Sequence, residues 1–267
     1  MSILQEEKIR ATVREGYGKI ALTTGSGCGC GPSCCDPADD ATLEIITTNT
    51  GYSKEDFAAV SEGANMGLGC GNPQAIASIK SGETVVDLGS GGGFDCFISA
   101  AQVGETGRVI GVDMTSEMIS KARSNAVDGG FENVEFRLGE IENLPVADNS
   151  VDVIISNCVI NLSPAKQKVF NDSHRILKSG GMLAISDVVA IVPIPEEIKQ
   201  DNDMYCGCVA GASTIKELQS MLEKSGFTDI KIEPMDKDII SAWNEGLPSS
   251  IKLEDIVASA SIEATKI

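Results

Sequence analysis

Basic residues are scarce in this chain. Lysine and arginine number 21 against 39 aspartate and glutamate residues, which gives a net charge of −18 over 267 residues. This charge opposes binding to a nucleic-acid backbone, and no basic patch offsets it. No stretch approaches the ~18 consecutive apolar residues that span a bilayer. The first ten residues are charged and lack the apolar core of a signal peptide, so we expect a cytoplasmic protein without nucleic-acid or membrane partners.

Histidine is almost absent, since His174 is the only one. A lone histidine is more often structural than catalytic, and we assign it no role. Cysteine, by contrast, is abundant. Nine are present: Cys28, Cys30, Cys34, Cys35, Cys70, Cys96, Cys158, Cys206 and Cys208. An odd number in a cytosolic chain argues against a disulfide framework and leaves metal or metalloid binding, redox chemistry or simple burial. For Cys96, within an apolar helical segment, burial is the preferred interpretation.

The order of predicted elements indicates an α/β fold. With 42% hydrophobic residues, the chain can bury a real core. Strands and helices alternate from residue 84 onward, which is typical of a doubly wound, mostly parallel sheet. The predicted strands are 84–88, 108–113, 133–138, 151–156, 182–189, 228–232 and an antiparallel 257–266, and the predicted helices are 1–24, 72–80, 94–103, 116–127, 164–177 and 213–224. Gly180-Gly181 is expected to end the helix that begins at Pro164, and 25–40 is expected to be a loop.

A glycine-rich loop follows the first strand of this alternation. Gly89-Ser-Gly-Gly-Gly93 lies between a strand and a helix, where glycines let the backbone turn sharply and approach a ligand. Asp113 ends the next strand, in the place of the usual acceptor for ribose hydroxyls. The combination is far more specific than a lone glycine motif. A tight turn without a ligand is the alternative.

The loop resembles that of class I S-adenosylmethionine-dependent methyltransferases, whose pattern Asp-x-Gly-x-Gly-x-Gly fits Asp87–Gly93. The segments 139–145, 148–153 and 177–182 match the same family. The resemblance implies that S-adenosylmethionine is the cofactor, with Asp113 at the ribose, Glu140 at the adenine amino group and Ile141 on the ring. The cofactor set that it implies is Asp87, Gly89, Ser90, Gly91, Gly93, Asp113, Met114, Glu140, Ile141 and Asn157.

Three cysteines lie in three separate loops, and within the methyltransferases these loops resemble those of arsenite methyltransferases. The loops are Gly67-Leu-Gly-Cys-Gly-Asn-Pro73, Ser156-Asn-Cys-Val-Ile-Asn161 and Cys206-Gly-Cys-Val-Ala-Gly-Ala212. The resemblance implies that Cys70, Cys158 and Cys208 bind trivalent arsenic. Cys206 is the alternative to Cys208, which is favoured because Gly211-Ala212 follows it. Thiolates suit arsenic(III) because both are soft. The lone pair of the bound arsenic can then attack the sulfonium methyl group.

The segment from residue 25 to 36 holds four further cysteines. Zinc binding is one interpretation, although the usual paired spacing is missing. The family resemblance implies that Cys34 and Cys35 take part in arsenic binding or disulfide exchange, and we predict a turnover disulfide from one of them to Cys70. Cys28 and Cys30 go beyond the family pattern.

Three parts are therefore expected. They are an N-terminal helix and cysteine-rich segment (1–64), a cofactor-binding domain (65–190) and a C-terminal part that completes the sheet and the arsenic site (191–267). The expected substrates are arsenite and methylated arsenicals, with a thiol reductant of the glutathione or thioredoxin type. Two rivals are a methyltransferase for a small organic metabolite, which needs a general base near the methyl group, and a non-catalytic, thiol-rich metalloid binder.

Overall fold

The computed structural model describes residues 2–22, 48–58, 60–61, 63–235, 240 and 252–267. The predicted loop 25–40, with Cys28, Cys30, Cys34 and Cys35, lies outside these residues. The roles predicted for those four cysteines therefore stay predictions.

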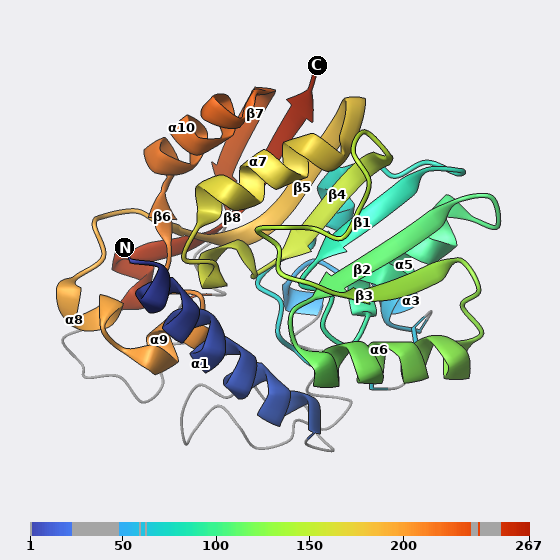
Figure 1. The fold of residues 1–267 in the computed structure, drawn as a ribbon, viewed down its shortest axis with the longest axis horizontal. Helices are drawn as coiled ribbons and strands as arrows, with labels where there is room; N and C mark the ends of the chain where they lie inside the picture. Colours follow the sequence, from blue (N-terminus) through green and yellow to red (C-terminus); the bar gives the residue numbers. More distant parts are fainter. Residues whose placement is uncertain (1, 23–47, 59, 62, 236–239, 241–251) are drawn as a thin grey trace.

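An eight-stranded sheet forms the centre of the molecule, in the order β3-β2-β1-β4-β5-β8-β7, with β6 paired to β5 (Figure 1). The pairs among β1 to β6 are parallel, whereas β8 runs antiparallel to both β5 and β7. The predicted doubly wound sheet with an antiparallel C-terminal strand is thus confirmed. The strands are β1 (Thr84–Leu88), β2 (Arg108–Asp113), β3 (Val134–Leu138), β4 (Val151–Asn157), β5 (Leu177–Ala190), β6 (Ser213–Thr214), β7 (Phe227–Pro234) and β8 (Val257–Lys266).

Helices cover both faces of the sheet. Successive side chains of a strand point to opposite faces, and because both faces of these strands are apolar, both must be buried. Val86 packs in one core with Phe170 of α7 and Leu218 of α10, and Val85 packs in a second core with Phe97 of α5. The described helices are α1 (Ile3–Leu22), α3 (Lys54–Ala58), α4 (Gln74–Ala77), α5 (Phe94–Val103), α6 (Ser116–Gly129), α7 (Lys166–Ile176), α8 (Glu196–Lys199), α9 (Asn202–Cys206) and α10 (Ile215–Ser225), with short 3-10 turns at Ile160–Leu162 and Leu253–Asp255.

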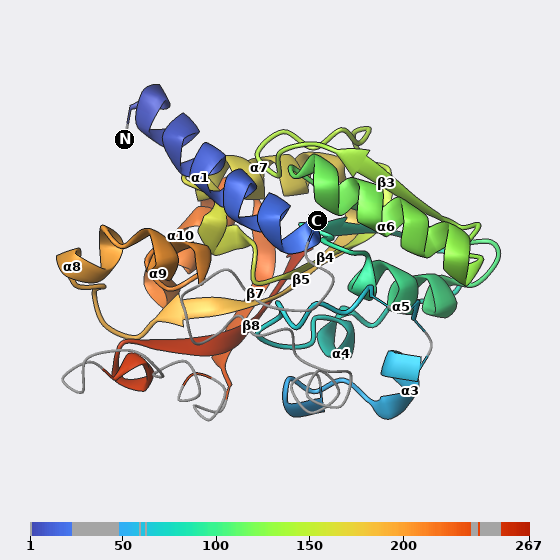
Figure 2. The same ribbon diagram turned by 90° about the horizontal axis from the view of Figure 1, so that it is seen from below.

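The first helix crosses the edge of the sheet at which the parallel strands end. Figure 2 shows α1 running from the region of α9 toward α6. Its Gly18 lies against Glu117 in the first turn of α6. A third buried cluster joins Val13 of this helix to the three loop cysteines and to Leu253 near the C-terminus. Residues distant in the sequence therefore meet beneath α1.

The predicted end of one helix was wrong, and so was the stop signal assigned to another. The helix expected to reach Lys80 ends at Ala77, because Ser78 takes the left-handed conformation with φ 46°. The helix that begins after Pro164 ends at Ile176, and β5 runs through Gly180-Gly181 rather than beginning after it. The pairing of β5 with β4 shifts register between Val151 and Val153, so these glycines fit an irregular strand and not a helix stop.

Candidate active site

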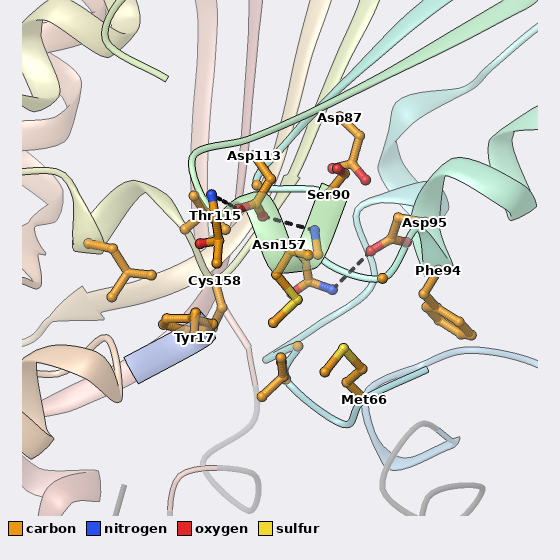
Figure 3. A pocket seen from close by; sticks show the side chains of 18 of the residues that line it. Tyr17, Met66, Asp87, Ser90, Phe94, Asp95, Asp113, Thr115, Asn157 and Cys158 are labelled. Carbon is orange, nitrogen blue, oxygen red and sulfur yellow. Dashed lines mark hydrogen bonds between the residues drawn. The ribbon is translucent and has the colours of Figure 1, made fainter. Parts of the chain in front are cut away.

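A cavity opens at the carboxyl ends of β1, β2 and β4, beneath α1 (Figure 3). This edge is where ligands bind in open α/β sheets. Of the predicted cofactor set, the residues that line the cavity are Asp87, Gly89, Ser90, Gly91, Asp113, Met114, Ile141 and Asn157. Gly93 and Glu140 do not line it. Most of the predicted cofactor residues are thus brought together around one cavity.

The glycine loop forms a cradle between β1 and α5. Gly89 has φ +71°, and a Cβ there would lie 2.3 Å from a methyl carbon of Val159, so only glycine fits. The backbone N–H of Gly91 donates to Oδ2 of Asp113 over 3.0 Å, which ties the loop to the end of β2. Ser90 Oγ is buried and has no hydrogen-bond partner within the described part of the chain. A bound ligand would satisfy that hydroxyl.

Three carboxylates line the cavity: Asp87 and Asp95 are buried, and Asp113 is partly buried. Burial raises the pKa of each, and for Asp87 the nearby Asp95 raises the pKa further. Among the described residues that line the cavity, Arg10 is the only basic one, and it pairs with other acids. An occupant that brings positive charge therefore suits this cavity.

Cys96 contributes to this arrangement as well as to the core. Its thiol is fully buried, as predicted, and donates a hydrogen bond to Oδ2 of Asp87 over 3.2 Å. Burial and the neighbouring carboxylate raise the pKa of the thiol, so it remains a donor. The apolar helical pattern predicted the burial but not the bond, because Asp87 belongs to a different element.

The carboxylates of Glu140 and Glu142 face α1. Glu140 accepts from Arg14 over 3.3 Å and lies 3.6 Å from Nε of Arg10. Glu142, which the sequence reasoning missed, lines the cavity and accepts from Arg10 over 3.2 Å. The role of Glu140 at the adenine stays a prediction, since its carboxylate is turned toward α1. Ile141 lines the cavity with 8% of its surface exposed.

The three loop cysteines converge on one buried cluster beside the cavity. Cys70 and Cys158 form a disulfide with their Cα atoms 5.8 Å apart. Cys208 Sγ donates to the backbone carbonyl of Cys158 over 2.8 Å. Cys158 also lines the cavity, so the sulfur cluster adjoins the space above the glycine loop. A disulfide and a third thiol, from loops far apart in the sequence, thus belong to one buried cluster, although the Cys208 sulfur is not among the atoms that lie within 4.8 Å of one another at the disulfide.

Cys206 lies apart from this cluster. It is partly exposed at the end of α9, and its backbone carbonyl accepts from the hydroxyl of Tyr17 over 3.1 Å. Cys208, in contrast, is buried and has φ +64°, a left-handed turn that directs the chain back from α9. This geometry supports the preference for Cys208 over Cys206.

Asp187 of β5 reaches the sulfur cluster and was missed by the sequence reasoning. Its carboxylate and the sulfur atoms of Cys70 and Cys158 lie within 4.8 Å of one another. The carboxylate accepts from the backbone N–H groups of Ile160 and Val188. Burial raises its pKa to about 6. A single acid inside an apolar strand carries no local pattern that would have revealed this position.

None of the described helices is long and apolar enough to cross a membrane. His174 lies in the last turn of α7 with its ring against Phe227, away from the cavity, which agrees with the absence of an assigned role. The expected alternative of a simple turn without a ligand does not account for the unpartnered serine and the buried carboxylates around the glycine loop.

Comparison with known proteins gives consistent results. A family model described as a methyltransferase domain matches residues 79–226. The arsenite methyltransferase of Halobacterium salinarum is 51% identical over 97% of this chain and 67% of its own length. That of Mus musculus is 36% identical over 90% of this chain and 63% of its own length. This chain thus spans about two thirds of the length of these two relatives.

Solved structures agree with the fold. An arsenic(III) S-adenosylmethionine methyltransferase from Chlamydomonas reinhardtii has a TM-score of 0.63 and 31% identity, and the match covers 84% of this chain and 73% of that one. A phosphoethanolamine N-methyltransferase from Haemonchus contortus, in complex with S-adenosyl-L-methionine, also reaches a TM-score of 0.63. At 19% identity, that second match concerns the fold alone.

Proposed function

Because the chain belongs to the arsenite methyltransferases, within the S-adenosylmethionine-dependent class I enzymes, we propose that it methylates trivalent arsenic. Arsenite is bound by the thiolates of Cys70, Cys158 and Cys208, and methylated arsenicals are the products. The observation that carries this proposal is the meeting of these three cysteines in one cluster that adjoins the cofactor cavity.

The cavity fits S-adenosylmethionine, which supplies an electrophilic methyl group on a sulfonium when it is bound. The unpartnered Ser90 hydroxyl, the glycine cradle and the three carboxylates that line the cavity suit a ligand with hydroxyls and positive charge. Asp113 would hold the ribose, Ile141 would pack on the adenine, and Asp87 would face the methionine part. Met114 would line the same end as Asp113.

The protein contributes position and exclusion of water more than acid–base catalysis. Three thiolates leave arsenic(III) pyramidal, with its lone pair on the open face. Transfer then needs the arsenic and the methyl carbon aligned in a dry site. Cys70, Cys158 and Cys208 are buried, so the arsenic would be shielded on the side of its ligands. The absence of a histidine near the cavity is no obstacle to this chemistry.

Arsenic binding requires the Cys70–Cys158 disulfide to be open. Two molecules of glutathione, or one dithiol of the thioredoxin type, reduce it to two thiols and become oxidised to a disulfide. The same couple serves after methylation, because transfer raises arsenic from trivalent to pentavalent and two electrons must return. We retain Cys34 and Cys35 as the proposed partners of Cys70 in that step.

Cysteine-to-serine variants test the ligand set. Cys158→Ser and Cys208→Ser should each abolish arsenite methylation and leave cofactor affinity intact, because serine keeps the size and replaces a soft donor with a hard one. Methylated products are measured by chromatography with elemental detection, and cofactor affinity by calorimetry. Cys206→Ser is the matched control and should retain activity. Full activity in both ligand variants would exclude this arsenic site.

A further inference from the structure

The backbone around Cys70 is held by one side chain from β4. Oδ1 of Asn157 accepts the backbone N–H of Cys70 over 3.0 Å, and Nδ2 donates to the carbonyl of Gly71 over 2.8 Å. A Cβ on Gly69 would lie 2.6 Å from Nδ2, so the loop packs directly on the amide. Ser259 of β8 donates to the carbonyl of Cys70 over 2.7 Å. Both backbone polar groups of Cys70 are therefore bound by side chains.

Asn157 is itself oriented by a buried tyrosine and a buried carboxylate. The hydroxyl of Tyr52 donates to Oδ1 of Asp95 over 2.7 Å, and the hydroxyl oxygen of Tyr52 accepts from Nδ2 of Asn157 over 3.0 Å. Nε2 of Gln74 donates to the same Oδ1 of Asp95 over 3.3 Å. Burial raises the pKa of Tyr52 well above its ordinary value, so the hydroxyl keeps its proton.

The directions of these bonds leave one orientation for the amide. The proton of the Tyr52 hydroxyl points to Oδ1 of Asp95, so the hydroxyl oxygen of Tyr52 must receive a hydrogen from Asn157. Nδ2 has two hydrogens, and its acceptors are the Gly71 carbonyl at 2.8 Å, the tyrosine oxygen at 3.0 Å and, more weakly, Oδ2 of Asp95 at 3.4 Å. Oδ1 is then the atom that faces the N–H of Cys70. The hydrogen bonds that link Asp95, Tyr52 and Asn157 thus determine how the amide of Asn157 binds the backbone of the Cys70 loop.

We propose that Asn157 is a positioning residue for the Cys70 thiol, and that Tyr52 and Asp95 act through it. The proposal rests on the proposed function, since it concerns one of the three arsenic ligands. It also changes the part predicted for Asn157, which was a direct cofactor contact. Tyr52, Asp95 and Asn157 line the cavity, as Figure 3 shows for the last two, yet both amide hydrogens of Asn157 serve the protein.

By holding the Cys70 loop, this network fixes the position of the Cys70 sulfur with respect to both the Cys158 sulfur and the cavity. Cys158 directly follows Asn157 in the chain, so the same point of β4 carries one arsenic ligand and holds the loop of another. Loss of the amide frees the loop from β4, and small displacements of reacting groups lower rates steeply. The expected defect is therefore in turnover and thiol geometry, and not in cofactor affinity.

Two variants and two readouts test the proposal. Asn157→Ala should lower kcat for arsenite methylation about 10- to 100-fold, while the calorimetric Kd for S-adenosylmethionine changes by less than about threefold, which is under 1 kcal/mol. Tyr52→Phe should give a smaller loss of the same kind. The double variant should be no worse than Asn157→Ala, because Tyr52 acts through Asn157. Asn171→Ala, an exposed position on α7, is the matched control and should match the wild-type protein.

The second readout needs no arsenic. In the reduced protein, oxidised glutathione forms the Cys70–Cys158 disulfide and leaves as two reduced glutathione molecules. Asn157→Ala and Tyr52→Phe should both slow this closure. The rate is measured by alkylating the remaining thiols at successive times and analysing the protein by mass spectrometry. The closure rate remains informative even when the protein has no activity on arsenite, so the two proposals fail separately. Wild-type closure and turnover in both variants would overturn the positioning role. A loss of cofactor affinity as large as the loss of kcat would make Asn157 a cofactor contact instead.

Discussion

The three carboxylates that line the cavity should make the affinity for the cofactor depend on pH. Asp87, Asp95 and Asp113 have raised pKa values in the free protein because they are buried. Each binds protons more readily than an exposed acid, and a cationic cofactor needs the ionised form. Protons must therefore leave before the cofactor binds, so affinity should rise as pH rises through the raised pKa values and fall at lower pH.

Calorimetry of S-adenosylmethionine binding between about pH 5 and 8 measures this dependence. Protons released on binding are obtained from buffers of different ionisation enthalpy. Asp113→Asn should weaken binding by about 1–3 kcal/mol, the usual value for hydrogen bonds to a charged group, and should also reduce the proton release. Affinity that is flat or decreases with pH would contradict the electrostatic part of the account.

Residues in local motifs were predictable from the sequence, and residues that act across the fold were not. Asp113 and the glycine loop stand in a strand–turn–helix–strand pattern that fixes their relation. Tyr52, Asp95 and Asp187 have no such pattern, because their partners are distant in the sequence. The three sulfur ligands were named from family resemblance, and only the fold brings Cys70 and Cys158 together.

Among the elements, α1 has the most direct bearing on the site. Val13 and Tyr17 of this helix line the cavity, and Arg10 pairs with Glu142 and Glu140 on the loop after β3. The guanidinium is largely removed from water, with 10% of the side chain exposed. Burial of this kind makes an ion pair sensitive to loss of one partner. The pairs therefore fasten α1 over the cavity.

Replacement of Arg10 should loosen that cover. Arg10→Leu removes the ion-pair partner of Glu142 at the cavity wall and leaves it only the hydrogen bond from Ser163. We expect S-adenosylmethionine to dissociate several-fold faster. Stopped-flow measurement of cofactor release is the readout. Lys19→Ala is the matched control on the same helix, because Lys19 pairs with Glu15 in an exposed position and such pairs contribute little. Equal release rates for all three proteins would show that α1 does not retain the cofactor.

Element prediction succeeded where periodicity was strong. The strands from β1 to β4 and the helices α5 and α6 were placed within a few residues, and Thr214 begins α10 with a capping box. The short elements α8, α9 and β6 were missed, since two to five residues carry no measurable period. Gly180-Gly181 misled the prediction because glycine serves a helix stop and an irregular strand equally well.

Across the whole molecule, one sulfur pair connects distant parts of the chain. The Cys70–Cys158 disulfide spans 88 residues. A cross-link over a long loop stabilises mainly by restricting the unfolded chain, typically by about 2–4 kcal/mol. We expect the free energy of unfolding of the oxidised protein to be about 2–4 kcal/mol higher than that of the reduced protein. Urea titration with and without reductant measures it, and Cys70→Ser should remove most of the difference. Identical midpoints in the wild-type protein would contradict this expectation.

The predicted division of the chain at residues 64 and 190 stays a prediction. One buried cluster contains residues from all three predicted parts. Val13, Cys158 and Leu253 belong to one buried cluster, although they come from the N-terminal, central and C-terminal parts. A site assembled in this way depends on contacts between residues that are distant in the sequence, and local sequence patterns do not reveal such contacts. The cysteines that we propose as arsenic ligands could be named from the sequence, whereas the geometry of the network around them could not.

Methyl transfer to arsenic within one turnover tests the central claim most directly. The reduced protein is mixed with S-adenosylmethionine that carries a trideuterated methyl group and with an equal amount of arsenite, and the arsenic species are released and analysed by mass spectrometry. The account predicts a monomethylated arsenical with the label on arsenic, and none from Cys158→Ser. Cofactor that remains intact, or a label that appears elsewhere than on arsenic, would contradict it.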